Sequence, residues 1–244
     1  MNINELVLSG GHVYALSYLG ALKHINIKQI NRYIGTSAGA IISCLIVLGY
    51  DPYKLEEIVL KLPLDKCMQV TSKDILSILD NFGATCTNKI INIISIFFTH
   101  KKIDRNINFI NLYKLTKKDL SIIVYCATDK QTIEFNYINT PNMSVILALQ
   151  MSISIPICFK PVVYNDKLYI DGATIDNLPW RFVHNQQKAI ALSVRSNPRK
   201  KNMHLFDYIE SLLEQCKYEL DNRIIQNNQN KIYIIHVCIY SNSW

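Results

Sequence analysis

Glycine and proline are scarce in this chain of 244 residues, with 8 and 7 copies respectively. Such low counts exclude a collagen-like repeat and argue against long disordered low-complexity tracts. The hydrophobic fraction of 49% and the charged fraction of 18% are instead typical of a globular protein. A chain of this length can bury a large apolar core, so we expect a single domain over residues 1–244.

The sequence also has no C-x-x-C pair among its seven cysteines, which are Cys44, Cys67, Cys86, Cys126, Cys158, Cys216 and Cys238. Unpaired cysteines in apolar runs indicate free thiols packed as small hydrophobic residues in a reducing compartment, and they give no support for zinc. The longest apolar runs, 38–49 and 90–98, are too short to span a bilayer. The first residues lack the basic and apolar regions of a signal peptide. We therefore expect a cytoplasmic protein that is soluble or peripheral at membranes.

Acidic residues are outnumbered, since 26 Lys and Arg against 19 Asp and Glu give a formal net charge of +7. The basic residues form loose clusters at 101–105, 114–118 and 195–201, which is typical of solvated loops and helix faces. The alternative is docking on anionic lipid headgroups. No nucleic-acid-binding motif accompanies the charge, so we expect no nucleic-acid partner.

Strands and helices alternate along the sequence. Apolar runs and turn residues predict strands at 6–8, 31–34, 120–127, 132–137, 189–194 and 231–237, and a hairpin of 162–164 with 167–170. Helices are predicted at 13–25, 38–48, 72–82, 88–98, 143–152 and 205–225, and another begins at Asp51-Pro52. This alternation predicts an α/β fold in which helices cover both faces of a mainly parallel sheet.

Two of these helices carry further expectations. The helix at 88–98 is apolar on more than one face, which favours a core helix, and the alternative is a lid or membrane-facing helix. The helix at 205–225 is amphipathic, and its spacing predicts which residues face inward. These are Leu205, Ile209, Leu212, Leu213, Cys216 and Leu220.

The most informative motif is G-x-S-x-G, in which Ser37 lies between Gly35 and Gly39. It follows a short strand and precedes an apolar helix, which is the arrangement of a nucleophile elbow. Small neighbours allow a tight turn that exposes the serine hydroxyl, and the N-terminus of the helix favours negative charge nearby. The alternative interpretation is a tight turn without catalytic function.

Two further segments could complete a site. In Ser9-Gly10-Gly11-His12, a glycine turn between strand and helix can leave N–H groups free to face an anion. It is otherwise an ordinary loop or a phosphate-binding loop, although it lacks the G-x-G-x-x-G pattern of dinucleotide sites. The Asp171-Gly172 pair ends a predicted strand, where a carboxylate can enter a cleft or form a common turn. No histidine lies in a motif that indicates a catalytic role.

Taken together, five segments resemble the patatin-like phospholipase family, in the order and spacing of that family from about residue 6 to 195. They are L-S-G-G at 8–11, L-G-A-L at 19–22, I-G-T-S-A-G-A at 34–40, M-S-I-S-I-P-I-C-F-K-P at 151–161, and Y-I-D-G-A at 169–173 with Asn177 and Pro179. The resemblance implies a three-layer α/β/α domain, completed by a C-terminal helix and strand at 204–238. It also implies hydrolysis of lipid or phospholipid esters at a membrane surface, without a metal or a cofactor.

The resemblance also implies roles for particular residues. Ser37 would be the nucleophile and Asp171 the base of a Ser-Asp dyad, with no catalytic histidine. The N–H groups of Gly10, Gly11 and His12 would bind the oxyanion. Motif support would come from Gly35, Gly39, Gly172 and Ala173.

The sequence departs from the family pattern G-G-G-x-[R/K]-G in its oxyanion loop. His12 replaces the third glycine, Tyr14 the basic residue and Ala15 the last glycine. An alternative is therefore a catalytically impaired family member that binds lipid or an unidentified protein partner. A second alternative is a Ser-Asp-His triad, with Ser37, Asp171 and either His204 or His236.

Overall fold

Short runs of buried branched residues form the centre of the molecule. The structure is a computed structural model that describes residues 3–62, 78, 80–196 and 205–237. Strands β1 (Glu5–Leu8) and β2 (Arg32–Thr36) are buried at every position, as expected of parallel strands that are covered on both faces. The remaining strands of this sheet are β4 (Asp119–Cys126), β5 (Gln131–Phe135), β7 (Val162–Tyr164), β8 (Lys167–Asp171), β9 (Ala189–Ser196) and β10 (Ile232–Val237).

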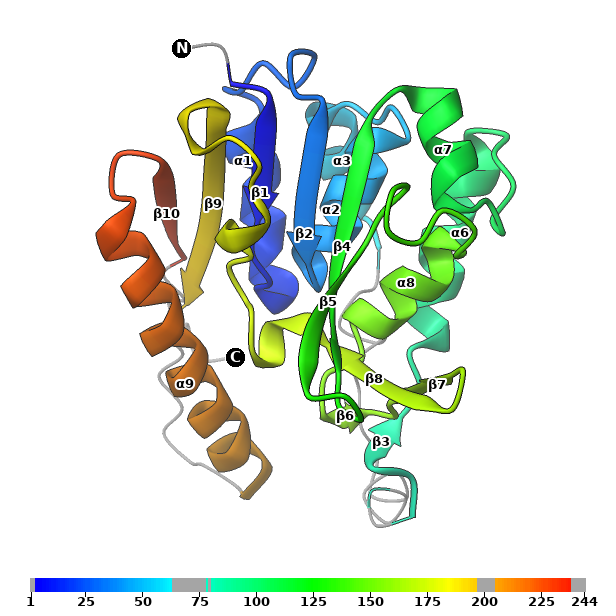
Figure 1. Cartoon of the computed structure of the whole chain (residues 1–244), viewed down its shortest axis with the longest axis vertical. Helices are drawn as coiled ribbons and strands as arrows, with labels where there is room; N and C mark the ends of the chain where they lie inside the picture. Colours follow the sequence, from blue (N-terminus) through cyan, green and yellow to red (C-terminus); the bar gives the residue numbers. More distant parts are fainter. Residues whose placement is uncertain (1–2, 63–77, 79, 197–204, 238–244) are drawn as a thin grey trace.

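The strand order is β10-β9-β1-β2-β4-β8-β7, and β5 pairs with β4 outside this path (Figure 1). The five strands from β10 to β4 are parallel, whereas β8, β7 and β5 join antiparallel. A second, two-stranded sheet pairs β3 (Gly83–Thr85) with β6 (Ile157–Phe159). The predicted mainly parallel sheet is thus confirmed.

Successive residues of the central strands enter two different cores. In β1, Leu6 and Leu8 belong to the larger core and Val7 to the smaller one. The larger core is closed by side chains of several helices, while the loop around Trp180 and the C-terminal helix cover the smaller core. The helices are α1 (Ser17–Leu22), α2 (Ala38–Val47), α3 (Pro52–Val59), α6 (Asn88–His100), α7 (Phe109–Thr116), α8 (Val145–Ser152) and α9 (Leu205–Asn227).

Most predicted elements are confirmed within one to three residues of their ends. The hairpin turn at Asn165 and Asp166 has φ values of 47° and 57°, as a primed two-residue turn requires. The helix predicted at 13–25 is shorter and begins as the 3-10 helix η1 (His12–Leu16) before α1. The helix predicted at 72–82 lies mostly outside the described residues.

Helix α9 corrects the sequence analysis. Leu212 and Leu220 are 42% and 41% exposed, and Cys216 is exposed as well. The helix instead buries Asp221 and Ile225 towards its C-terminal end. Its inward face is polar where it lines a cavity and apolar at Ile225, which joins the smaller core, so apolar spacing selected the wrong face. The side chains of Leu205, Ile209 and Leu213 lie outside the described ones.

The cysteines follow the prediction only in part. Cys44 and Cys126 are buried free thiols and Cys158 is half-buried, whereas Cys86 and Cys216 are exposed. The remaining predicted thiols, Cys67 and Cys238, are outside the described ranges.

Helix α6 is a core helix on its inner face, as its sequence favours. It packs Ile91, Ile94 and Phe98 into the larger core, but Ile96 is 65% exposed on its outer face. Among the helices that the structure describes, none is both long enough and apolar enough to cross a bilayer.

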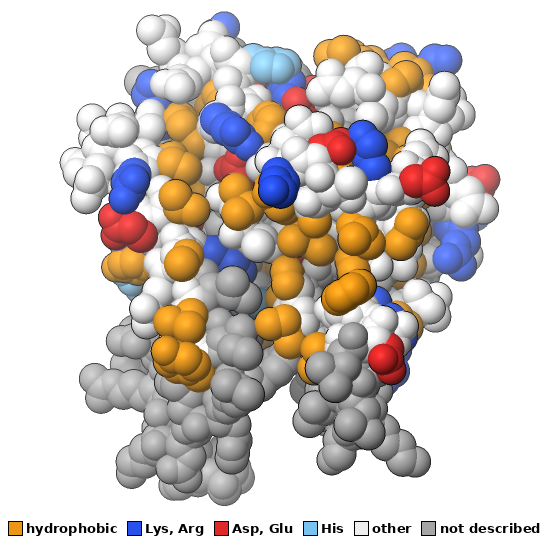
Figure 2. Space-filling view, turned by 60° about the horizontal axis from the view of Figure 1, so that its bottom comes forward, with side chains coloured by type: hydrophobic (Ala, Val, Ile, Leu, Met, Phe, Trp, Pro, Cys, Tyr) orange, Lys and Arg blue, Asp and Glu red, His pale blue; other side chains and the backbone are white. Residues whose placement is uncertain are grey.

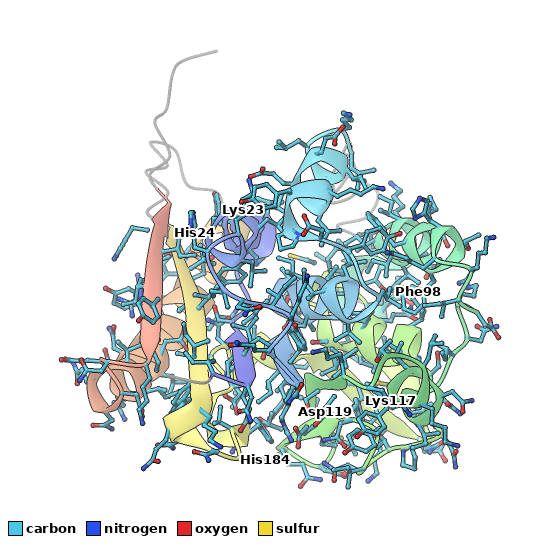
Figure 3. The ribbon with its side chains drawn as sticks, turned by 90° about the horizontal axis from the view of Figure 1, so that it is seen from above. Lys23, His24, Phe98, Lys117, Asp119 and His184 are labelled. Carbon is cyan, nitrogen blue, oxygen red and sulfur yellow. The ribbon has the colours of Figure 1, made fainter. Side chains whose placement is uncertain are left out.

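A buried charge cluster lies at the end of the sheet opposite to the carboxyl ends of its parallel strands. Figure 3 looks onto this end and labels Asp119 and His184. Arg32 donates to Glu134 and lies 3.2 Å from an Asp119 oxygen and 3.8 Å from a Glu5 oxygen. His184 contacts the same guanidinium through a ring nitrogen at 2.6 Å. Burial raises the pKa of Asp119 to about 6, and the charge of Arg32 only partly opposes this shift.

Replacement of Arg32 should therefore be costly. We expect Arg32→Met to lower the free energy of unfolding by about 3–5 kcal/mol, because it leaves buried carboxylates without a cation. Urea denaturation at neutral pH measures the change. Lys61→Met is the control, because it breaks only the exposed Lys61–Glu57 pair and should cost less than about 1 kcal/mol. Equal losses in the two variants would contradict a structural role of the cluster.

Candidate functional site

Ser37 occupies a strained turn between β2 and α2. Its φ of 54° and ψ of −124° are unusual for a residue with a side chain. The turn is tight because the backbones of neighbouring segments touch it on both sides. A Cβ atom on Gly35 would lie 2.6 Å from the Cα of Ala40, and one on Gly39 would lie 2.3 Å from the carbonyl oxygen of Leu8. Glycine is therefore required at both positions of the motif.

Two hydrogen bonds hold Ser37 in this turn. Its hydroxyl donates to Oδ2 of Asp171 at 2.6 Å. Its backbone N–H donates to the hydroxyl of Ser152 at 2.9 Å, and that hydroxyl donates in turn to the carbonyl of Ile123 at 2.7 Å. Ser152, at the end of α8, thus ties the turn to β4. Sequence reasoning assigned Ser152 no role, since it stands 115 residues away from Ser37.

Asp171 ends β8 and is only 2% exposed. Its second oxygen, Oδ1, accepts the N–H of Ala173 at 2.7 Å. Gly172 lies against β4, where a Cβ would come within 2.5 Å of the carbonyl oxygen of Ile123. Burial raises the pKa of Asp171 to about 6, and the charge of Lys217 and the two hydrogen bonds only partly oppose this shift. The carboxylate is therefore a stronger base than an exposed aspartate.

The glycine loop, residues 9–12, passes beside this pair. A Cβ on Gly10 would lie 3.3 Å from the Cβ of Ser37 and 2.7 Å from Oδ1 of Asn177. The Gly10 N–H donates to the carbonyl of Asn177 at 3.2 Å, so it is not free to face an anion as the sequence analysis expected. The N–H groups of Gly11 and His12 bond no acceptor among the residues that the structure describes.

His12 stands where the family pattern has glycine, and its backbone keeps the conformation that glycine favours. Its φ is 48°, in the left-handed region that costs a residue with a Cβ roughly 1–2 kcal/mol. The ring lies 3.5 Å from a carboxylate oxygen of Glu214. Burial, followed by the charge of Lys217, lowers the pKa of His12. A neutral imidazole is therefore favoured at this position.

Two cavities meet at Ser37 and His12. The first is apolar, with an empty volume of about 1020 Å³ that includes open solvent, and it is lined by side chains of η1, α1, α2, α3 and α6. The second is polar, and its wall includes the glycine loop, Asp171 and side chains of α9. Figure 2 shows this end of the molecule, with hydrophobic side chains spread over its surface. The serine hydroxyl thus lies between an apolar and a polar compartment.

Among the described residues, no histidine of the alternative triad is hydrogen-bonded to Asp171. Within the described part of the chain, the hydrogen-bond partners of the Asp171 carboxylate are Ser37 and Ala173. His236 is exposed on β10, and His204 lies outside the described residues. The described ranges also contain no group of three or more His, Cys, Asp or Glu side chains that could hold a metal ion.

The fold therefore brings together the residues that the sequence analysis selected from distant segments. Ser37, Asp171 and the glycine loop meet at one point, and the glycines of their motifs permit the close approach. The polar residues that α9 contributes were missed. Glu214, Lys217 and Asp221 line the second cavity, and their spacing of three and four residues was the only available signal.

Comparisons with known proteins agree with this fold. The family model described as patatin-like phospholipase matches residues 6–184. A protein named probable lipid hydrolase 463L, from Invertebrate iridescent virus 6, is 31% identical over 93% of this chain and 83% of its own length. An uncharacterized protein of Acanthamoeba polyphaga mimivirus, R571, is 29% identical over 72% of this chain and 60% of its own length.

Solved structures resemble the chain in fold. VipD from Legionella pneumophila superposes with a TM-score of 0.65 at 16% identity, over 100% of this chain and 63% of VipD. ExoU from Pseudomonas aeruginosa, in its complex with SpcU, gives a TM-score of 0.54 at 16% identity, over 94% of this chain and 53% of that one. The chain thus spans less than two thirds of these two solved proteins.

The burial of Asp171 predicts a penalty on stability that depends on pH. Its folded pKa of about 6 exceeds its ordinary value of 3.8, so the folded state binds the proton more tightly. The loss of stability is absent at a pH below the ordinary pKa of 3.8. It grows as the pH rises towards the folded pKa of about 6 and is complete above it. We expect Asp171→Asn to be more stable than the wild type by roughly 3 kcal/mol near pH 8 and equally stable near pH 3. Urea denaturation across this range measures the gap, and a gap that is constant with pH would contradict the prediction.

Proposed function

The chain belongs to the patatin-like phospholipase family, and from this premise we propose that it hydrolyses carboxylic esters of lipids through a dyad of Ser37 and Asp171. The observation that carries the proposal is the buried hydrogen bond of 2.6 Å between the Ser37 hydroxyl and the Asp171 carboxylate. A base within this distance of a serine hydroxyl is the geometric requirement for an activated nucleophile.

The reaction would proceed in two steps. In the first, Ser37 Oγ attacks the ester carbonyl carbon while its proton passes to Asp171. The ester C–O bond then breaks, Asp171 returns the proton to the leaving alcohol, and the acyl group remains on Ser37. In the second step, Asp171 takes a proton from water, which attacks the acyl-enzyme. The fatty acid leaves and Ser37 recovers its proton, so that the dyad ends as it began.

The developing oxyanion needs N–H donors close to Ser37. We propose Gly11 and His12 from the glycine loop, together with the first turn of α2 at Ala38. The positive end of a helix dipole also favours negative charge at this point. Gly10 is not among these donors, because its N–H donates to Asn177. Its function is instead to let the loop approach Ser37 closely.

The two cavities suggest how a lipid would lie. The acyl chain would enter the apolar cavity that η1, α1, α2, α3 and α6 line, and the alcohol part would lie in the polar cavity that also reaches Ser37. The alternative, a family member that binds lipid or a protein partner without turnover, is favoured by the backbone strain at His12. ExoU has been solved in complex with a second protein, SpcU, so a partner for this chain is part of that alternative.

Removal of either dyad residue should abolish turnover. We expect Ser37→Ala and Asp171→Asn to reduce fatty-acid release from mixed lipid vesicles by about a thousandfold or more. The controls are His236→Ala and His204→Ala, which should keep most of the activity. If both dyad variants keep wild-type turnover, the dyad is wrong, and loss with either histidine variant would instead favour a triad.

A fluorophosphonate probe separates the enzyme from the binding protein. Labelling of the wild type but not of Ser37→Ala would support an activated serine. A wild type that neither reacts with the probe nor releases fatty acid, while an active relative does both, would favour the binding protein.

The apolar cavity predicts a dependence on acyl-chain length. Ile93 of α6 lines the cavity, so Ile93→Trp should fill part of it. We expect this variant to lose about tenfold or more in kcat/KM for a palmitoyl ester, while the butyryl ester of the same alcohol is hydrolysed as before. Ile96→Trp places the same ring on the exposed face of the helix and should change neither. Equal losses of kcat/KM for the palmitoyl and butyryl esters would show that the acyl chain does not bind in the apolar cavity.

A further inference from the structure

Two buried hydroxyl groups contact the glycine loop beside Ser37. They belong to Ser9 and Tyr18, which both have an exposed fraction of 0%. The Ser9 hydroxyl donates to the carbonyl oxygen of Gly10 at 2.8 Å. The Tyr18 and Ser9 hydroxyl oxygens lie 2.7 Å apart, and the Tyr18 oxygen accepts the backbone N–H of Val194 at 3.0 Å. These contacts connect the loop to strand β9.

The hydrogen bonds among these groups have a definite direction. A hydroxyl group has one hydrogen atom, and Ser9 uses its own on the Gly10 carbonyl. Tyr18 is therefore the donor in its contact with Ser9. Burial raises the pKa of Tyr18, so the phenol keeps the hydrogen that this bond needs. We call the series of bonds from the Val194 N–H through Tyr18 and Ser9 to the Gly10 carbonyl the Ser9–Tyr18 relay.

The orientation of the Gly11 N–H follows from that of the Gly10 carbonyl. Both groups belong to one planar trans peptide unit, in which the C=O and the N–H point in opposite directions. A hydrogen bond that holds the carbonyl towards Ser9 therefore holds the N–H away from it. Gly11 lines the polar cavity together with Ser37 and Asp171, and its N–H bonds no acceptor among the residues that the structure describes. The relay thus orients a free donor beside the reacting groups.

The neighbouring peptide units of the loop are held in other ways. The Gly10 N–H donates to the Asn177 carbonyl at 3.2 Å. The Gly11 carbonyl accepts the N–H of Ala15 at 3.2 Å, and this bond fixes the His12 N–H on the opposite side of its own peptide unit. The His12 donor is therefore held by backbone alone, whereas the orientation of the Gly11 donor depends on two side chains.

We propose that Ser9 and Tyr18 are positioning residues that fix the peptide unit between Gly10 and Gly11 and so keep the Gly11 N–H oriented to bind the oxyanion. This inference rests on the proposed hydrolysis at Ser37 and explains how its oxyanion site is formed before a substrate binds. Glycine on both sides of a peptide unit lets it rotate at low cost. Without the relay, the Gly10 carbonyl is free to turn into the polar cavity, where it would repel the oxyanion.

The first arm of the test observes this peptide unit directly and does not depend on turnover. Gly10-Gly11 is the one Gly-Gly pair in the sequence, so protein made with glycine that carries ¹³C in its carboxyl group and ¹⁵N gives a single carbonyl-to-amide NMR correlation. A carbonyl carbon that loses a hydrogen bond shifts upfield. We expect this upfield shift in Ser9→Ala, which removes the donor, and a smaller one in Tyr18→Phe, which leaves the Ser9 hydroxyl free to rotate.

The matched control for this arm is Tyr33→Phe. It also removes a buried phenol hydroxyl, which donates to the Ile27 carbonyl at 2.8 Å, and Tyr33 belongs to the larger core. A general effect of a lost buried hydroxyl should therefore appear in this variant as well. An unchanged carbonyl signal in Ser9→Ala, or an equal shift in Tyr33→Phe, would overturn the relay.

The second arm uses the amide proton of the same correlation. Once a fluorophosphonate has labelled Ser37, a phosphonyl oxygen takes the place of the oxyanion. We expect the Gly11 amide proton to shift downfield in the labelled wild type as it donates to this oxygen, and to shift less in labelled Ser9→Ala. A labelled wild type without this shift would remove Gly11 from the oxyanion donors, and an equal shift in the two proteins would show that the relay is not needed to orient it.

The third arm measures turnover. We expect Ser9→Ala to lose about tenfold in kcat with less than about a twofold change in KM, because an oxyanion donor acts mainly in the transition state. Tyr18→Phe should lose less, and the double variant no more than Ser9→Ala alone, because both substitutions interrupt one relay. Tyr33→Phe should keep the wild-type kcat. Losses that multiply in the double variant would contradict a single relay.

Failure of the proposed function gives a different result from failure of this inference. Wild-type protein that neither releases fatty acid nor reacts with the fluorophosphonate, while the carbonyl signal still shifts in Ser9→Ala, would overturn hydrolysis at Ser37 and leave the orientation of the peptide unit by the relay standing. Active wild-type protein with an unchanged kcat in Ser9→Ala would instead overturn the positioning role and leave the dyad standing.

Discussion

The buried hydrogen bond between Ser37 and Asp171 depends on backbones that approach closer than side chains normally allow. Gly35 and Gly39 let β2 turn into α2, and Gly172 lets the end of β8 lie against β4. Ser152 then fixes the strained turn by accepting its N–H. These contacts cannot adjust easily, because they are made by backbone and by small side chains. The sheet therefore sets the distance between the Ser37 hydroxyl and the Asp171 carboxylate.

Both ends of the sheet bury a carboxyl group whose pKa is raised by burial to about 6. At one end, the Arg32 guanidinium lies beside Asp119, Glu134 and His184 and opposes the shift at Asp119. At the other end, Asp171 is buried with hydroxyl and amide donors but, among the described residues, without a contacting cation. Stability is lost at the second end, and basicity is gained, which is the trade that a site for proton transfer requires.

The sequence could predict those parts of the fold and of the site whose signal lies within neighbouring residues. The strands, the Ser37 turn and the strand-ending Asp171 each carry their signal within a few neighbouring residues, and the family resemblance joined them. The face of α9 could not be predicted in the same way, because Leu212 and Leu220 repeat at helical spacing while the cavity selects the polar side. The hydrogen bond from the Gly10 N–H to the Asn177 carbonyl could not be predicted either, because a glycine turn does not show which of its N–H groups will donate to another loop.

Which charged side chains lie beside Ser37 depends on the folded structure and cannot be judged from the glycine loop alone. A substituted glycine loop, judged alone, suggests a weakened site, because His12 carries strain and Tyr14 carries no charge. In the folded chain, however, the N–H groups of Gly11 and His12 bond no acceptor among the described residues, and α9 places a lysine at the same cavity from a distant segment. The helix whose inward face the sequence analysis misassigned therefore brings charged side chains to the cavity beside Ser37.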